Sequence, residues 1–79
     1  MKAKVYVTFK KGVLDPQGKA VGAALESMGY HEVKSLRIGK FIEIDLNGLS
    51  KTEAEERLKE MCKKLLANTV VEDYKVEIE

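Results

Sequence analysis

The feature that most restricts the fold is a change of hydrophobic period across residues 10–19. Before it, residues 2–9 alternate apolar and polar side chains, and the apolar set from Ala3 to Phe9 lies on one side, as in a strand that packs one face on a core. After it, apolar residues recur at the spacing of an amphipathic helix. The chain therefore combines strands and helices in 79 residues, enough for a single domain over 1–79.

The connection itself carries the signals of a helix start. Asp15 is predicted as the N-cap, and Pro16 takes the first helical position, where its missing N–H has no partner. Gly18 lies in the opening turn, where glycine costs about 1 kcal/mol relative to alanine. Such a glycine is typical of a place where something approaches the backbone closely, which makes the loop a candidate contact surface. An ordinary capped turn is the alternative interpretation.

The middle of the chain predicts one helix end and two strands. Gly29 is suited to the left-handed position that ends the first helix. Residues 32–46 then show two alternating runs around Gly39 and Lys40, which predicts an antiparallel hairpin with a tight turn there, or a bulge in one long bent ribbon.

The last third predicts a capped helix and a final strand. Ser50 and Glu53 form the pattern of a capping box. Asn68 is suited to a left-handed position at the helix exit, and residues 70–78 alternate again as a strand. The predicted apolar face of this helix consists of Ala54, Leu58, Met61, Cys62 and Leu65.

These elements predict an α+β fold. The order is strand, helix, strand, strand, helix, strand, and the expected architecture is a two-layer sandwich of the ferredoxin-like type, with an antiparallel sheet and both helices on one of its faces. The sheet face that carries Tyr6 and Thr8 is not fully polar and is a candidate for a second layer or a second subunit.

Composition narrows the range of possible functions. With 14 basic and 13 acidic residues the net charge is +1, which predicts no nucleic-acid or membrane partner, and no run of residues resembles a membrane span or signal peptide. We therefore expect a cytoplasmic protein. One cysteine and one histidine predict neither an internal disulfide nor a metal site. A chain this small has a thin core, so association with another chain is the expected source of further stability.

No catalytic residue is predicted. Cys62 is interpreted as a small buried hydrophobe. The glycines Gly12 and Gly18, with lysines at 10, 11 and 19, suggest a phosphate cradle, but the P-loop pattern fails because Ala20 stands where serine or threonine is required. A ferredoxin-like module that binds a ligand or RNA is the alternative function, although stacking aromatics are few. An acylphosphatase-like hydrolase lacks the expected arginine-bearing phosphate loop.

Three motifs in register resemble a known family. They are residues 12–20 (GVLDPQGKA), residues 39–43 (GKFIE), and residues 61–68 (MCKKLLAN) with Glu72, Asp73 and Tyr74. Together they resemble PurS, the family of small subunits of the multi-subunit formylglycinamide ribonucleotide amidotransferase of purine biosynthesis. The resemblance covers nearly the whole chain. Thr69 departs from it, because the family usually has proline after the asparagine.

The resemblance implies a non-catalytic subunit. It implies a homodimer or tetramer that bridges a glutaminase subunit and an ATP-dependent synthetase subunit and supports transfer of glutamine-derived ammonia. No cofactor of its own is implied, since ATP and magnesium are used by the synthetase. The residues implied to bind partners, each with a purely structural role as the alternative, are Asp15, Pro16, Gln17, Gly18, Gly39, Lys40, Asn68, Glu72 and Tyr74.

Overall fold

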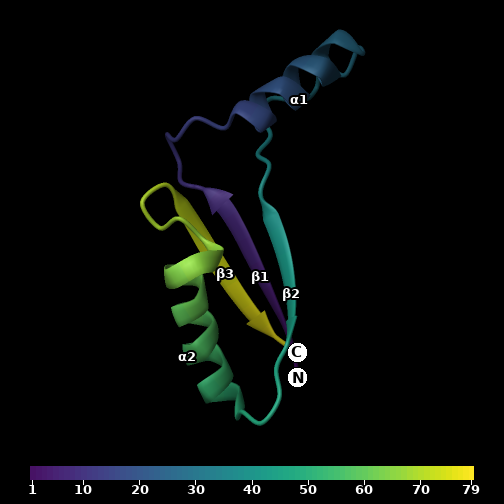
Figure 1. Ribbon diagram of the computed structural model, residues 1–79. Helices are drawn as coiled ribbons and strands as arrows, with labels where there is room; N and C mark the ends of the chain where they lie inside the picture. Colours follow the sequence, from purple (N-terminus) through teal and green to yellow (C-terminus); the bar gives the residue numbers. More distant parts are fainter.

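The computed structural model describes all residues, 1–79, and divides into a sheet layer and a projecting arm (Figure 1). The elements along the chain are β1 (Lys2–Phe9), α1 (Pro16–Ser27), β2 (Lys40–Asp45), α2 (Lys51–Met61), the π-helical turn η1 (Cys62–Leu66) and β3 (Glu72–Ile78). None of the helices is long and apolar enough to cross a membrane.

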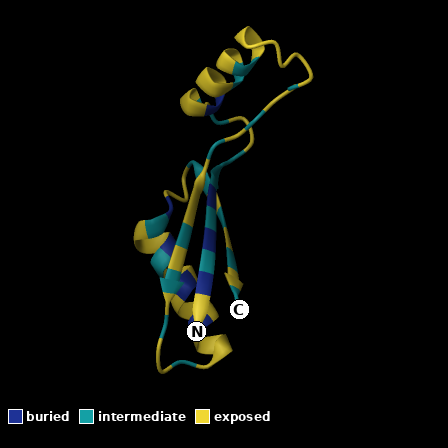
Figure 2. Ribbon diagram, turned by 90° about the vertical axis from the view of Figure 1, so that its right-hand side faces the viewer, coloured by how far each residue is buried: buried dark blue, intermediate teal, exposed yellow.

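The sheet is antiparallel, with β1 in the centre and the strand order β2-β1-β3. Val5 lies opposite Ile42 on one side and opposite Val76 on the other. The predicted α+β class, the antiparallel sheet and the alternation of β1 are confirmed, since Ala3, Val5 and Val7 are fully buried. The core that they form beneath α2 is small, because only eight of the 79 residues are buried (Figure 2).

The placement of α1 differs from the predicted sandwich. Only α2 lies on the sheet, next to β3, whereas α1 projects beyond the end of β1 (Figure 1). Three of the five apolar residues of α1 are alanines, which each bury little apolar surface. The molecule is accordingly elongated, with extents of 50 × 25 × 14 Å.

The predicted hairpin between residues 32 and 46 is also wrong. Residues 33–39 belong to no helix or strand, and the chain continues from them into β2 without a tight turn. The segment runs back beside α1 instead (Figure 1), and its Ile38 amide donates to the Asp15 carboxylate at 2.9 Å. The alternative, a bulge in one long bent ribbon, is not present either, because only Lys40–Asp45 forms a strand. Hereafter, "the arm" denotes α1 and the returning chain, residues 16–38.

The end of the second helical segment also differs from the prediction. The amide of Ala67 donates to the carbonyl of Cys62, a five-residue spacing that widens the last turn. This turn rotates Leu66 and Ala67 toward the core and leaves Leu65, predicted as part of the apolar face, 83% exposed. Cys62 is buried as predicted, and burial raises the pKa of its thiol.

The caps follow the sequence more closely. Ser50 and Glu53 form the predicted capping box, and Gly29 has the predicted left-handed conformation, with φ of 96°. Asn68 does not have the predicted left-handed conformation, because no residue other than glycine has positive φ. Its side-chain oxygen instead accepts from the Val70 amide at 3.2 Å, which makes it the first residue of an Asx turn.

Truncation of two leucines, one in α2 and one in η1, tests which side of this helical segment faces the core. Leu58→Ala should lower the free energy of unfolding by about 2–5 kcal/mol, because Leu58 is fully buried and the truncation leaves a cavity. Leu65→Ala, the same truncation at an exposed site, should change it by no more than about 0.5 kcal/mol. Urea denaturation measures both, and equal losses would contradict the π-turn register.

Candidate partner-binding site

The three groups of predicted site residues meet at the end of β1. Asp15 connects to Ile38, which precedes Gly39 and Lys40. On the other side, the Lys10 amide donates to the Val71 carbonyl at 2.9 Å, which ties the start of the loop to the turn before β3. Segments far apart in the sequence thus converge. We call residues 9–19, 34–40 and 67–74 the junction.

Asp15 organises the junction. One carboxylate oxygen accepts from the Gly18 amide at 2.9 Å, which is the predicted N-cap bond, and the other accepts from the Ile38 amide at 2.9 Å. The Ile38 and Gly18 amides, in that order of effect, hold the pKa of Asp15 below its usual value, with Arg37 adding a smaller contribution. The carboxylate therefore caps α1 and anchors the returning chain at the same time.

Gly18 is required by this arrangement. It is the one buried residue of α1, and a Cβ at this position would lie 2.8 Å from Cγ of Asp15 and 3.1 Å from the Leu36 carbonyl oxygen. The predicted close approach is therefore present, and the approaching groups belong to this chain itself. Gly39 has a related role, because an added Cβ would collide with the Val7 carbonyl and lie 2.9 Å from the Thr8 methyl group.

Three further predicted site residues, Pro16, Gln17 and Lys40, are exposed. Pro16 is the first residue of α1, as predicted, and Gln17 follows it on the exposed first turn. Lys40 is exposed at the start of β2, opposite Val7. These side chains are available for contact with another protein, and no interaction within the chain occupies them.

The helix exit is held by local bonds. The Glu72 carboxylate accepts from the Asn68 amide at 2.7 Å, and the Asn68 carbonyl accepts from the Glu72 amide at 2.7 Å. Tyr74 lies on the sheet face beneath α2 and packs against the core. Asn68 and Glu72 thus shape the turn, which leaves the exposed Thr69 and Val70 as its tip.

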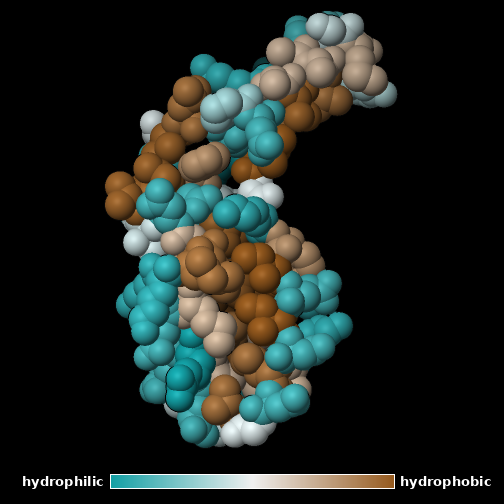
Figure 3. All heavy atoms as spheres, viewed as in Figure 1, coloured by the Kyte–Doolittle hydropathy of each residue, from teal (hydrophilic) through white to brown (hydrophobic).

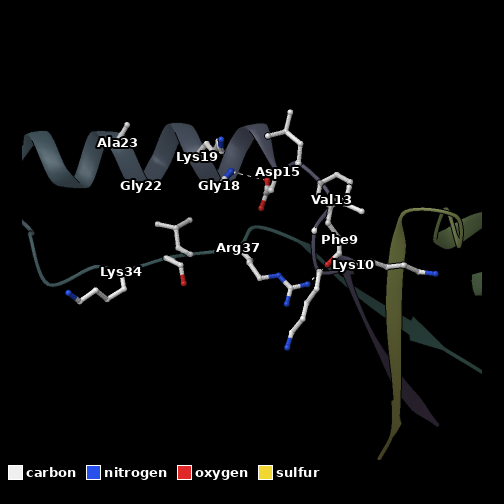
Figure 4. Close-up of a pocket in the computed structure, with 15 residues that line it drawn as sticks. Phe9, Lys10, Val13, Asp15, Gly18, Lys19, Gly22, Ala23, Lys34 and Arg37 are labelled. Atoms are coloured by element: carbon white, nitrogen blue, oxygen red, sulfur yellow. Dashed lines mark hydrogen bonds between the residues drawn. The ribbon is translucent and has the colours of Figure 1, made fainter.

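Sequence reasoning missed Arg37. Its guanidinium donates to the Phe9 carbonyl and so spans the gap between the end of β1 and the returning chain (Figure 4). No periodicity or motif marks this residue, because the contact joins positions 28 apart in the sequence. Phe9 itself, predicted on the core side, is half-buried and, like Arg37, lines a cavity between α1 and the returning chain.

Gly18 and Gly22 form a matched pair for testing the junction. Gly18→Ala should destabilise the arm by about 1–3 kcal/mol, because its Cβ overlaps the Asp15 carboxylate. Gly22→Ala should be neutral or stabilising by up to about 1 kcal/mol, since its Cβ would meet only the Leu36 side chain, at 3.8 Å. Hydrogen exchange of the arm amides reports both effects. Equal protection in the two variants would disprove the close approach.

Acid should release the Asp15 contacts. Because the folded pKa of this carboxyl is lowered, its contribution to stability is present above the unfolded value, near 3.8, and is lost as the pH falls through the folded pKa. The amide NMR signals of Gly18 and Ile38 should therefore titrate together, with a midpoint below 3.8. In Asp15→Ala the two signals should not share such a midpoint. Independent titration in the unmodified protein would contradict the double contact.

Comparison with known proteins identifies relatives over almost the full length. The family model described as PurS, phosphoribosylformylglycinamidine (FGAM) synthase, matches residues 2–79. The PurS subunit of phosphoribosylformylglycinamidine synthase from Bacillus subtilis is 55% identical over 78 residues, which cover 99% of this chain and 92% of that one. The corresponding subunit from Methanocaldococcus jannaschii is 42% identical over 78 residues, covering 99% and 94% of the two chains.

Solved structures agree with this similarity. B. subtilis PurS superposes with a TM-score of 0.88 at 55% identity, covering 99% of this chain and 96% of that one. A chain in the structure of PurLQS from Thermotoga maritima superposes with a TM-score of 0.87 at 36% identity, covering 96% and 93%. The elongated arrangement, with the arm away from the sheet, is therefore shared with experimental structures.

Proposed function

The chain belongs to the PurS family of phosphoribosylformylglycinamidine synthase subunits, and from this premise we propose that it joins the glutaminase and synthetase subunits of that enzyme. The observation that carries the proposal is the similarity to a chain within PurLQS, a structure named for three components together. In this role the chain supports transfer of glutamine-derived ammonia to an ATP-dependent synthetase. The catalytic groups, ATP and magnesium belong to the other subunits, and the assembly works in the cytoplasm.

The junction is the proposed contact surface. Its loop presents Gln17 and Lys40 on a backbone that Asp15, Gly18 and Gly39 hold in place. A surface fixed in this way loses little conformational entropy when a partner binds. The tip of the turn before β3, at Thr69 and Val70, extends the surface on the other side.

The proposal includes a homodimer. The radius of gyration is 15.9 Å, whereas a compact chain of this length has about 12 Å. Apolar side chains on the arm are exposed, among them Val21 and Met28, and the half-buried Ile42 and Ile44 lie on β2, the strand farthest from α2. Figure 3 shows apolar surface on the sheet layer and on the arm. A second copy of the chain would cover these surfaces and enlarge the thin core.

A binding module for RNA is the second candidate. Tyr6 and Phe41 lie together on the sheet face away from α2, with ring centroids 5.2 Å apart, and the Lys75 ammonium lies 5.9 Å from the Tyr6 ring. Such a face is able to stack a base. Family membership favours the subunit role. On this face, moreover, Lys2 and Lys75 are paired with Glu43 and Glu77, whose carboxylates repel a phosphate backbone.

Reconstitution tests the subunit role. Formylglycinamidine ribonucleotide synthesis from glutamine by the glutaminase and synthetase subunits should require this chain, whereas synthesis from ammonia by the synthetase should persist without it. Gln17→Arg should weaken assembly with little effect on folding, and Ser27→Arg, which adds the same charge at the exposed far end of α1, serves as the control. Light scattering of the isolated chain should give twice its 8.9 kDa mass.

Two results would count against the proposal. If glutamine-supported turnover is the same with and without the chain, the bridging role is wrong. If a correctly folded Gln17→Arg variant assembles as well as the Ser27→Arg control, the loop is not the contact surface.

A further inference from the structure

A cavity of about 750 Å³ lies in the junction between α1 and the returning chain (Figure 4). Its walls are the loop after β1, the first turns of α1 and residues 34–37. The volume falls in the range of pockets that hold small molecules. The contact surface proposed above presents Gln17, Lys40 and the tip at residues 69 and 70, none of which lines this cavity.

The charge of the chain is concentrated around the cavity. Its basic lining residues, hereafter the basic group, are Lys10, Lys11, Lys19, Lys34 and Arg37. Asp15 is the single acidic residue among them, which leaves a formal surplus of four positive charges. The other nine basic and twelve acidic residues of the chain carry a net charge of −3, although the whole chain is nearly neutral.

The basic group is not neutralised within the chain. The four ion pairs of the structure involve none of its members. The two oxygens of Asp15 are occupied by the Gly18 and Ile38 amides. Arg37 uses one guanidinium nitrogen on the Phe9 carbonyl, which fixes the group at the cavity and leaves further N–H donors available. Because the Gly18 amide is occupied, the site depends on side-chain cations and not on the helix N-terminus.

The cavity also offers apolar surface. Its hydrophobic lining residues are Phe9, Val13, Leu14, Ala23 and Leu36. On α1 the cavity is lined by Gly18, Lys19 and Gly22, whereas Val21 and Met28 lie on the other side of the helix at 100° per residue. A second copy of the chain on the apolar side of the arm therefore leaves the cavity open.

We propose that this cavity binds a phosphate ester, a small molecule with a phosphate group and an apolar or planar part. Lysine ammonium groups and an arginine fork are the side chains that recognise phosphate. The apolar lining would contact the carbon skeleton of the ester. The proposal concerns the chain by itself and does not rest on its role in the synthase, so each can fail without the other.

Phenyl phosphate is a suitable probe for the full-length chain. Titration at low salt, followed by amide NMR, should give saturable shifts confined to residues 10–19 and 34–37. Lys19→Gln with Lys34→Gln should weaken binding by about fivefold or more, because two favourable charges are lost. Lys63→Gln with Lys64→Gln removes the same charge from exposed positions of η1 and should leave the affinity unchanged. The unaltered α2 and sheet signals establish that each variant is folded.

Four results would overturn the proposal. They are shifts that do not saturate, an equal loss of affinity in the two double variants, an affinity for inorganic phosphate equal to that for phenyl phosphate, and tighter binding of a glutamate-rich peptide than of phenyl phosphate. The last would assign the cavity to an acidic polypeptide. We expect inorganic phosphate to bind more weakly than phenyl phosphate. We also expect only the double variant at Lys19 and Lys34 to lose affinity.

Discussion

The Asp15 carboxylate is the interaction on which the arrangement of the arm depends. It accepts one amide from the first turn of α1 and one from Ile38, 23 residues later in the chain. A helix of 12 residues has little stability in isolation, so α1 depends on such contacts for its position. Gly18 permits the contact, because any side chain at that position would occupy the space of the carboxylate. One acidic residue and one glycine thus hold the start of α1 against the returning chain, and Arg37 ties that chain to the end of β1.

The two parts of the molecule differ in how they are stabilised. The sheet layer has a small apolar core in which Val5 and Leu58 are fully buried. The arm has no core of its own and is held by hydrogen bonds and close backbone packing. Polar contacts at a partly exposed site contribute modestly to stability, which makes the arm the part that gains most from a partner. This division suits a subunit whose role is to contact other chains.

Sequence reasoning succeeded where the signal was local. The alternation of β1, the Asp15 N-cap, the capping box at Ser50 and the left-handed Gly29 are each set by residues within a few positions of one another. It failed where distant segments compete. Residues 33–38 have the alternation of a strand, yet they form none and lie along α1, since Ile38 bonds to the cap residue Asp15 and Arg37 bonds to Phe9 at the end of β1. The fold brings the three segments that carry the candidate residues together at the junction, and Arg37, which also joins it, carries no local signal.

The sequence by itself determined the family, the α+β class and nearly all of the helix and strand positions, because periodicity, caps and motifs are properties of short segments. Only the tertiary structure decided where the arm lies and which residues meet at the junction. It also placed Leu66 instead of Leu65 against the core, through a π turn that the α-helical period does not predict. These outcomes depend on contacts between segments far apart in the chain, and on the geometry of one turn, and hydrophobic spacing encodes neither.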